Sequence, residues 1–341
     1  MRMKNKTSLK GDGKGLSLKQ DGQEKPAFWN TEKRYYDLKS FFRNRFGCPV
    51  YKLPIDAGFT CPNRDGFVAS GGCIYCDGRG SRLRQAGPLP TVTEQVRAGK
   101  DFYRNRRGAK KFIAYFQTFT NTYGPPEKLE ALYGEALREE DVVGLSIGTR
   151  PDCVPDPVID LLAGLARDRH VWIEYGLQSM HDRTLRFLNR GHDRAAFLDA
   201  ISRTAGKNIF ICVHIIVGLP GETEEDILET VAQIASLPIQ GIKIHLLLAL
   251  RGTPLGDLYE RGEIALMTME RYVNTVCNIL ESLPPEMTIQ RLTADGYRDI
   301  YLAPGWGRNK MEVLNAIDRE LKQRDSFQGA RYRHPKEIGL V

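Results

Sequence analysis

Hydrophobic residues occur along the chain in two alternating patterns. Short continuous apolar runs, such as Val142 to Ile147, are followed by longer segments whose apolar residues recur at helical spacing. Continuous apolar runs are typical of parallel strands buried on both faces, because a strand with one wet face alternates apolar and polar residues. The runs predict strands over residues 51–57, 111–116, 142–148, 171–177, 209–217 and 241–248.

The segments of helical periodicity lie between and around these strands. Six strand–helix units in succession favour an α/β fold, a partial (β/α)6 barrel rather than a closed eight-stranded one. Beyond residue 256 the alternation stops, and a helix over 267–282, a short strand over 287–292 and a helix over 311–323 are expected. The other predicted helices cover residues 31–45, 91–105, 126–139, 155–168, 181–188, 193–206 and 222–236.

The two ends of the chain differ from its centre. Residues 1–26 carry seven Lys or Arg against three Asp or Glu and only five apolar side chains. Such a segment cannot bury enough surface to offset the entropy cost of ordering. We therefore predict a disordered basic tail over 1–28, a core barrel over 29–255, and an extension over 256–341 that closes the open side of the barrel.

Composition limits the class of protein. With 341 residues and 41% hydrophobic content, the chain can form one large barrel with a full core. No apolar run reaches the roughly 18 residues that a membrane span needs, and the basic N-terminus lacks the apolar stretch of a secretory signal. Seven cysteines without a disulfide-framework spacing favour a reducing compartment. We expect a cytoplasmic protein with no membrane partner.

Three of the seven cysteines lie in one glycine-rich loop after the first strand. Cys61, Cys73 and Cys76 have the spacing C-x11-C-x2-C, whereas the other four are scattered singly. A structural zinc ion normally takes four ligands, and the chain has no second Cys or His pair to complete the set. Three thiolates on a cubane iron–sulfur cluster would leave one iron open to a small molecule. A zinc knuckle or unused thiols are the alternatives.

The segment Asp-Ala-Gly-Phe-Thr-Cys-Pro-Asn-Arg-Asp-Gly, from Asp56 to Gly66, resembles the YhcC- and YtqA-like radical SAM (S-adenosylmethionine) proteins, relatives of the elongator catalytic subunit. The resemblance extends over roughly residues 34–325. It implies that the three cysteines bind a [4Fe-4S] cluster, that SAM chelates the open iron, and that an electron from the cluster cleaves SAM to methionine and a 5′-deoxyadenosyl radical. The commonest superfamily spacing is C-x3-C-x2-C, so the first gap here departs from it. Tyr75 matches the aromatic residue usual between the last two cysteines, which can shield the cluster and lie near the adenine.

Polar or glycine-rich residues follow each of the six predicted strands, where the chemistry of parallel barrels gathers. Gln117 stands where many superfamily members carry a glycine–glycine–glutamate motif, and its amide oxygen could accept from the SAM ammonium. Thr149 and Arg150 could hold the ribose or the SAM carboxylate. Capping of the following helix is the alternative use of this segment, and it is the one that we favour for Asp156.

The fourth and fifth strands supply further candidates. Glu174 and Gln178 lie on one face of a strand and could contact SAM, although Glu174 could instead pair with an arginine such as Arg190. Gly218 begins a Gly-Leu-Pro-Gly-Glu run shared by several radical SAM families, and it would let the backbone approach a flat ligand. The same turn can simply start a helix with Thr223 as its N-cap. The candidate SAM contacts are therefore Tyr75, Gln117, Thr149, Arg150, Glu174, Gln178 and Gly218.

The substrate is less defined than the cofactors. The relationship to the elongator subunit suggests wobble-uridine chemistry on transfer RNA, with an electron donor such as flavodoxin or ferredoxin. The net charge of +7 argues little for nucleic acid, because the tail holds much of it. Only arginines around the cysteine loop, Arg64, Arg79, Arg82 and Arg84, are placed to meet phosphates, since the basic run 103–107 precedes a strand. A small metabolite, a protein target, and a non-enzymatic electron-transfer module are the alternatives.

Overall fold

The structure is a computed structural model that describes residues 19–20, 23–79 and 88–333. Most of the predicted tail, including residues 1–18, lies outside these ranges. None of the helices in the described part of the chain is long and apolar enough to cross a bilayer. All seven cysteines are free thiols.

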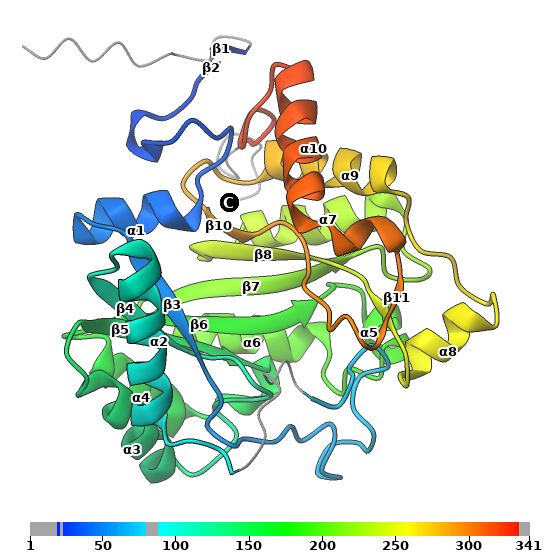
Figure 1. Ribbon diagram of the computed structural model, residues 1–341. Helices are drawn as coiled ribbons and strands as arrows, with labels where there is room; N and C mark the ends of the chain where they lie inside the picture. The colour runs from blue at the N-terminus through cyan, green and yellow to red at the C-terminus, as the bar shows by residue number, and fades with distance from the viewer. Residues whose placement is uncertain (1–18, 21–22, 80–87, 334–341) are drawn as a thin grey trace, which may run out of the picture.

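A curved sheet of seven parallel strands forms the centre of the molecule (Figure 1). Most of its strands are the apolar runs that the sequence predicts, and every residue of β6 is buried. The strand order across the sheet is β10-β8-β7-β6-β5-β4-β3. The strands are β3 (Val50–Ile55), β4 (Lys111–Phe116), β5 (Val142–Thr149), β6 (His170–Gln178), β7 (Phe210–Val217), β8 (Gly241–Leu246) and β10 (Thr288–Arg291).

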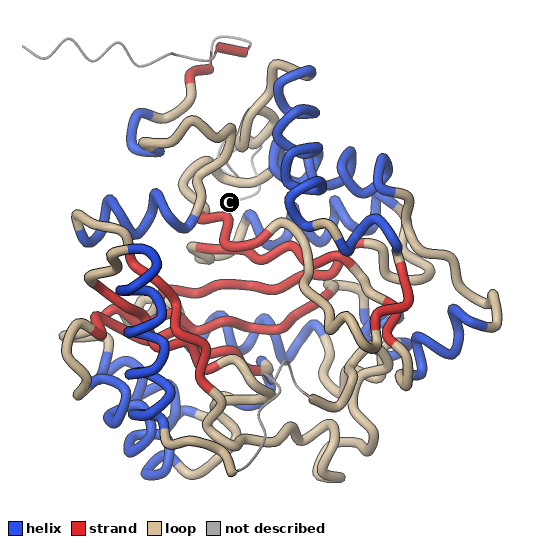
Figure 2. Tube along the Cα trace, in the orientation of Figure 1, coloured by secondary structure: helices blue, strands red, loops and turns tan. Residues whose placement is uncertain are grey.

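Helices cover the outer face of this sheet, and Figure 2 shows them in blue around the red strands. The crossovers after β6 and β7 end in α6 (Arg194–Thr204) and α7 (Glu224–Ala235). The partial α/β barrel predicted from the apolar pattern is therefore confirmed. The other helices of the crossovers are α2 (Val92–Arg107), α3 (Pro126–Leu137), α4 (Asp156–Leu165) and the short α5 (Asp182–Phe187).

Two helix starts differ in how their first N–H groups are satisfied. Thr223 caps α7 as predicted, and its hydroxyl and the Asp226 carboxylate form a reciprocal capping box. The expectation that Asp156 caps the helix after β5 is wrong. Pro155 occupies that position without a side-chain cap, and Asp156 is the first helical residue, with its carboxylate 3.1 Å from Arg203.

The chain beyond the sixth strand contributes to the barrel itself. The short strand expected over 287–292 is β10, which pairs in parallel with β8 and becomes the seventh strand of the sheet. On its flank, α9 (Met269–Ser282) packs between α7 and α10 (Lys310–Gln323). A small second sheet joins β9 (Ala249–Leu250) to β11 (Tyr301–Ala303). Trp306 packs its ring 5.4 Å from Tyr272.

The N-terminal helix is shorter than its periodicity predicts. It begins at Leu38 and ends at Phe46, as α1, with the Asp37 carboxylate accepting from the Ser40 N–H at 2.8 Å. The residues before it are not helical, because Tyr36 and Asp37 pair with distant segments instead. The Tyr36 carbonyl accepts from Ile289 N–H, and the Tyr36 N–H donates to the Gln328 side chain. These tertiary hydrogen bonds override the local helical pattern.

Aromatic rings close the end of the barrel where the strands begin. Phe41 of α1 lies 5.4 Å from Trp172 and 5.7 Å from Phe210, between ring centroids. His170, the first residue of β6, lies among the same rings, 4.6 Å from Phe210. These rings fill the interior at this end, which we call the aromatic plug, and the cavity that the cysteines face lies at the opposite end, where the strands finish.

Candidate functional site

The cysteine loop follows β3 and doubles back on itself. A turn forms at Cys61, whose carbonyl accepts from the N–H groups of Arg64 and Asp65 at 2.8 and 3.1 Å. The Gly72 N–H then donates to the Asn63 carbonyl at 2.8 Å, so the end of the long gap returns to its start. The eleven intervening residues therefore bring Cys61 to the same cavity as Cys73 and Cys76.

Two asparagines fasten this loop to the segment after α5. Asn63 is fully buried, and its amide donates to the Asn189 carbonyl at 2.5 Å. In return, the Asn189 amide donates to the Gly72 carbonyl at 2.9 Å. Gly191 has a φ of +74°, and a Cβ there would lie 2.3 Å from the Asn63 Oδ1 atom. The position thus requires glycine for its conformation and for its space.

Arg190 provides a buried positive charge beside the cysteines. Its Nη1 atom lies 3.5 Å from the Cys73 sulfur, and its Nη2 donates to the Gly176 carbonyl at 2.7 Å. Burial alone would raise the pKa of the Cys73 thiol, but the neighbouring guanidinium outweighs it, and the pKa lies below its ordinary value. For Cys76 burial outweighs the influence of the Arg64 guanidinium, and the pKa of its thiol lies above the ordinary value.

The three cysteines face a cavity of about 220 Å³, which we call the cysteine lobe. Its wall comes from the ends of β3 to β7, so residues far apart in the sequence meet there. The cysteine lobe is lined by Cys61, Arg64, Gly72, Cys73, Tyr75, Cys76, Tyr115, Gln117, Phe119, Thr120, Gly148, Thr149, Arg150, Glu174, Gly176, Gln178, Arg190 and His214.

A second cavity of about 260 Å³, the C-terminal lobe, adjoins the first. Tyr75, Cys76, Gln178 and His214 line both lobes. The far wall of the C-terminal lobe is residues 294–297, in the loop after β10, together with Leu246 to Leu248 at the end of β8. The two lobes together form one site with a cysteine side and an extension side.

A histidine pair stands at the border of the lobes. The rings of His214 and His245 lie 5.2 Å apart between centroids. Burial lowers the pKa of His214 to about 4, and that of His245 well below its ordinary value, so both rings are neutral near pH 7. The Nε2 atom of His245 is buried without a hydrogen-bond partner among the described residues.

Glu174 lies at the wall of the cysteine lobe, where charged side chains surround its carboxylate. One carboxylate oxygen lies 2.6 Å from Lys52 Nζ and 2.5 Å from the Ser146 hydroxyl. The other binds Lys243 Nζ and, at 2.9 Å, His214 Nε2. Burial opposes charge on Glu174, but Lys243 and Lys52 hold its pKa well below the usual range. The carboxylate is therefore ionised and orients the His214 ring.

The sequence of the barrel matches a known superfamily. Residues 61–234, about half of the chain, match the Radical SAM superfamily, and residues 239–323 match the Radical_SAM C-terminal domain. The chain belongs to the Radical SAM superfamily. The resemblance inferred from the cysteine segment is thus confirmed.

Its relatives in this superfamily include proteins of similar length. The chain is 43% identical over 308 residues to the uncharacterized protein YtqA of Bacillus subtilis, covering 90% of this chain and 96% of that protein. It is 37% identical over 280 residues to YhcC of Escherichia coli, covering 82% and 89%. Elongator complex protein 3 of Schizosaccharomyces pombe is more distant, at 24% identity over 82% of this chain and 60% of that protein.

A solved structure shares the fold of this radical SAM chain. It is the Elp3 protein of the archaeon Methanocaldococcus infernus with an N-terminal deletion, at a TM-score of 0.61 and 17% identity. The match covers 82% of this chain and 64% of the archaeal one, so this chain spans just under two thirds of its length. At this identity the match shows the fold alone, which is the partial barrel.

The arrangement of the three cysteines fits the iron–sulfur cluster that the superfamily implies. No group of three or more His, Cys, Asp or Glu side chains within the described ranges is placed to hold a single metal ion. A cubane cluster spreads its ligands over separate iron corners, so its cysteines need only face one cavity, as these do. The guanidinium and amide beside Cys73 are the donors that cluster sulfurs accept from. These residues fit the cluster better than one zinc ion.

Several predicted SAM contacts line the cysteine lobe but also have partners within the chain. Arg150 is almost fully buried and forms a bidentate pair with Asp152, at 2.9 and 2.7 Å. Its third nitrogen donates to the Arg190 carbonyl at 2.8 Å. The Thr149 hydroxyl contacts that of Thr122 at 2.5 Å. Both side chains are therefore held in place at the wall of the lobe.

Gln117 and Gln178 both line the cysteine lobe, from the ends of different strands. Gln117 follows β4, where its backbone N–H donates to the Ile55 carbonyl at 3.3 Å. Gln178 ends β6 with a φ of +77°, at an irregularity in its pairing with β7. A residue other than glycine in this conformation is strained, and such strain is often found at ligand sites. Gln178 lies between the two lobes and can contact a ligand in either.

Gly218 lies apart from the other predicted site residues. It has a φ of +93°, but the space where its side chain would project is filled by Met267, at 3.2 Å, rather than by a cavity. Glu174 also differs from one sequence-based alternative, because its partners are lysines and a histidine and not Arg190. Both findings depend on neighbours that are remote in the sequence.

Sequence reasoning missed two residues that shape the radical SAM site. Lys52 is a charged residue within the apolar run of β3, and this signal was visible, because a lysine in a buried strand needs a partner. Asn63 holds the cysteine loop, but an asparagine in a loop is ordinary, and no sequence signal distinguishes it. The 294–297 wall was expected only as part of a general covering extension.

Two of the four arginines expected around the cysteine loop contact other residues of the protein. Arg79 donates to Asp299 at 3.1 Å and stacks 4.9 Å from the Tyr297 ring. Arg64 packs against Gly72 and donates to the Gly71 carbonyl at 3.3 Å. Arg82 and Arg84 lie outside the described residues. The basic run at the end of α2 precedes the start of β4, at the end of the barrel opposite to the cysteines.

Proposed function

We propose that the chain is a radical SAM enzyme with its cluster on Cys61, Cys73 and Cys76, SAM in the cysteine lobe, and its substrate in the C-terminal lobe. The observation that carries the proposal is the meeting of these three thiols in one cavity at the carboxyl end of a parallel barrel. When bound there, the cluster and SAM supply a reductive cleavage of the sulfonium that leads to hydrogen abstraction from the substrate.

The residues of the chain have separate tasks in this proposal. Arg190 offsets the negative charge of the thiolates, and Asn63 keeps the long loop folded so that Cys61 stays near the other two. Tyr75 lies at the junction of the lobes, where it can cover the cluster. Gln117, Thr149 and Arg150 offer amide, hydroxyl and guanidinium groups to the amino-acid and ribose parts of SAM.

The surroundings of the site favour a reaction that must exclude water. The aromatic plug closes one end of the barrel, and the extension covers the C-terminal lobe at the other. His214 has its Nε2–H directed at Glu174, because the ring is neutral and the carboxylate can only accept. Its Nδ1 is then an acceptor, which can receive a hydrogen bond from the substrate.

For the substrate, we propose the wobble-uridine side chain of a transfer RNA, with an electron donor of the flavodoxin or ferredoxin type in the cytoplasm. Likeness to the elongator subunit supports this class, and the C-terminal lobe can admit a nucleoside that is unpaired from its neighbours. The C-terminal lobe also suits a small metabolite, which would be the alternative outcome of the test below.

Two measurements test the proposal. Anaerobic reconstitution with iron and sulfide, followed by SAM and dithionite, is expected to yield 5′-deoxyadenosine. Cys73→Ala should abolish it, whereas Cys48→Ala, which removes a partly exposed thiol elsewhere, should not. Absence of deoxyadenosine from the reaction of the parent protein would contradict the enzyme assignment.

A second experiment decides the substrate. The modified nucleosides in transfer RNA from a deletion strain are compared with those from its parent strain, and identical profiles would exclude transfer RNA as the substrate.

A further inference from the structure

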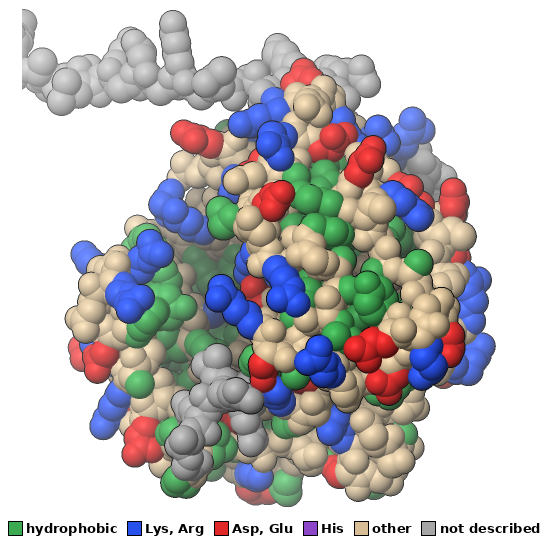
Figure 3. Space-filling view, turned by 45° about the vertical axis from the view of Figure 1, so that its right-hand side comes forward, with side chains coloured by type: hydrophobic (Ala, Val, Ile, Leu, Met, Phe, Trp, Pro, Cys, Tyr) green, Lys and Arg blue, Asp and Glu red, His purple; other side chains and the backbone are tan. Residues whose placement is uncertain are grey.

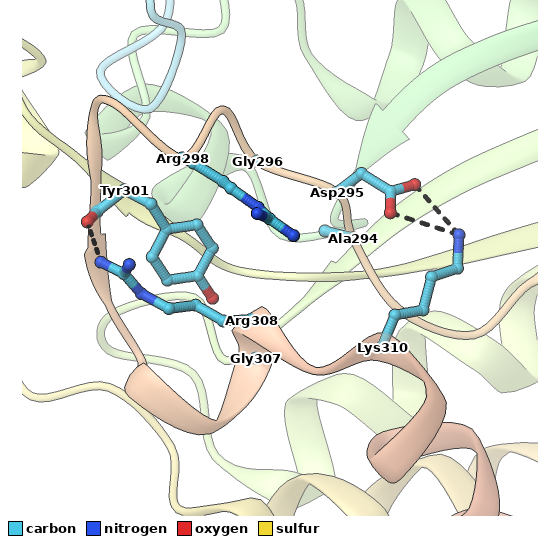
Figure 4. A pocket seen from close by; sticks show the side chains of 8 residues that line it. All are labelled: Ala294, Asp295, Gly296, Arg298, Tyr301, Gly307, Arg308 and Lys310. Atoms are coloured by element: carbon cyan, nitrogen blue, oxygen red, sulfur yellow. Dashed lines mark hydrogen bonds and ion pairs between the residues drawn. The ribbon is translucent and has the colours of Figure 1, made fainter.

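Beside the C-terminal lobe, the extension forms a cavity of about 470 Å³ that the proposed chemistry does not use. The two cavities share Ala294, Asp295 and Gly296, so one stretch of chain is the wall between them. We call this second cavity the basic pocket (Figure 4). Its other lining residues are Arg298, Tyr301, Gly307, Arg308 and Lys310.

The basic pocket carries more positive than negative charge. Asp295 is its single carboxylate among the described lining residues, and it is already bound by Lys310 at 3.1 Å and by Arg291 at 3.6 Å. Arg298 and Arg308 therefore have no opposing charge in the pocket. Figure 3 shows Lys and Arg side chains gathered beside the hollow on this face of the molecule.

Arg298 is the residue most available to a ligand. It is exposed, and it forms no hydrogen bond or ion pair with any other described residue. In Figure 4 its side chain extends across the pocket, between Tyr301 and Asp295. A long side chain that crosses a cavity without a partner offers all five of its N–H groups to whatever enters.

Arg308 also lines this cavity, from the turn after β11, and its guanidinium is directed at the Tyr301 carbonyl (Figure 4). Its Nη2 donates to the Tyr301 carbonyl at 2.5 Å, and its guanidinium lies 4.8 Å from the Tyr301 ring. Gly307 leaves room for that ring, because a Cβ there would lie 2.4 Å from the Tyr301 hydroxyl. Packing thus fixes Tyr301, and Tyr301 fixes Arg308, with further guanidinium donors left unused.

Two guanidinium groups around a cavity match the chemistry of phosphate. Arginine binds phosphate through parallel N–H groups, and such charge-assisted bonds are stronger than neutral ones. The shared wall adds a geometric condition, since a phosphate in the basic pocket would lie just across residues 294–296 from a group in the C-terminal lobe. A nucleic acid has a phosphate on each nucleotide. It can therefore place one nucleoside in the C-terminal lobe and the phosphate of a neighbouring nucleotide in the basic pocket.

We propose that the basic pocket binds backbone phosphates of an RNA next to the nucleoside that enters the C-terminal lobe. The inference rests on the proposed function and adds to it the surface that holds the RNA. Other basic residues at this end of the barrel are weaker candidates, because Arg79 is paired with Asp299 and Arg64 packs against the cysteine loop. The basic run of α2 is at the other end.

Binding of transfer RNA by the reconstituted full chain, followed by fluorescence anisotropy, tests this proposal without any turnover. The variant Arg298→Gln with Arg308→Gln is compared with Arg106→Gln and Arg107→Gln, which removes the same charge from exposed positions on α2. Near about 0.1 M salt, each lost phosphate contact is expected to weaken binding about fivefold to tenfold. The slope of log affinity against log salt should fall by about 1 per contact, and the control should keep both values.

The outcomes separate the two proposals. If the parent protein binds RNA and the pocket variant binds it equally well, the basic pocket is not the site, while an RNA substrate remains supported. Equal weakening of the α2 control would also overturn the pocket, since it would indicate non-specific attraction. If the parent protein binds no transfer RNA, the proposed RNA function itself fails. Arg298→Gln alone keeps the test valid if the loss of the Arg308 bond to Tyr301 unfolds the double variant.

Discussion

Both oxygens of the Glu174 carboxylate are bound by neighbouring side chains. It has no exposed surface, and two lysines, a serine and a histidine bind its two oxygens. Lys52 also reaches Gln290 at 2.7 Å, and so one side chain contacts groups from the first strand of the sheet to the last. At the scale of the residue, Glu174 is therefore a structural centre of the barrel as well as part of the wall of the cysteine lobe.

Replacing this charge should destabilise the fold strongly. Glu174→Gln leaves Lys52 and Lys243 without their counter-charge, and breaking a buried pair in this way typically costs about 3–5 kcal/mol. Chemical denaturation of the cluster-free protein would measure the loss. Adding Lys243→Met should restore part of it. A variant that keeps its stability and loses only SAM affinity would instead make Glu174 a cofactor contact.

His170 makes the stability depend on pH. Burial lowers its pKa to about 3, from an ordinary value of about 6.5. Below the ordinary value the unfolded chain takes up a proton that the folded ring refuses, so stability falls as the pH drops from about 6.5 towards 3. The expected slope is about 1.4 kcal/mol per pH unit.

His170→Phe tests this dependence. Phenylalanine suits a position among aromatic rings, and it removes two ring nitrogens that have no partner among the described residues. Unfolding free energies at about pH 7.5 and about pH 5 should differ by about 2 kcal/mol less in the variant than in the parent. An unchanged difference would mean that His170 is solvated and titrates normally.

At the scale of elements, the cysteine loop depends on its contact with the segment after α5. Gly191→Ala would drive a Cβ into Asn63, which holds the returning half of the loop. Gly206 is a matched control, because its φ of +76° is nearly the same and no atom lies within 4 Å of its Cβ position. Both variants should lose about 1–2 kcal/mol from the left-handed conformation.

Only Gly191→Ala should also lower the iron and sulfide bound per chain after anaerobic reconstitution. The physical reason is displacement of Asn63 and, with it, of the loop between Cys61 and Cys73. Colorimetric iron and sulfide assays on the two variants would measure this. Equal and full loading in both would show that the cysteines converge without the asparagine contacts.

The elements also show how far the sequence predicts this structure. The six long strands follow from apolar runs, and the cysteine spacing indicates the site, because these signals are local. The start of α1 at Leu38 and the place of β10 beside β8 do not follow, since each depends on a partner far along the chain. The same holds for Gly218, whose neighbour Met267 belongs to another segment. The sequence predicts which residues end each strand and therefore line the cavity. It does not predict the hydrogen-bond partners of these residues, because the partners come from other parts of the chain.

At the scale of the whole molecule, the two ends of the described chain are joined. The Gln328 side chain is fully buried, accepts from Tyr36 N–H at 2.9 Å, and donates to the carbonyls of Pro284 and Met287. It thereby connects the segment before α1 to the extension that carries β10. The barrel and its extension are expected to unfold together, in one transition.

Gln328→Ala tests this connection. The change removes one partner from each of three buried hydrogen bonds, and it should cost about 2–4 kcal/mol, since each loss leaves a polar group unsatisfied. Gln323→Ala, on the exposed side of α10, should cost little. Circular dichroism and tryptophan fluorescence should give coincident transitions in the parent. Separate transitions in the parent would show that the extension folds independently.

The division of the cavity has a consequence for how such an enzyme could diversify. Tyr75, Cys76, Gln178 and His214 line both lobes, so under the proposed function a change in any of them would disturb cofactor and substrate at once. Residues 294–297 line the C-terminal lobe but not the cysteine lobe, and residues 294–296 also separate it from the basic pocket. New substrate preferences can therefore arise by exchanging this one short wall, while the machinery that generates reactivity is inherited unaltered.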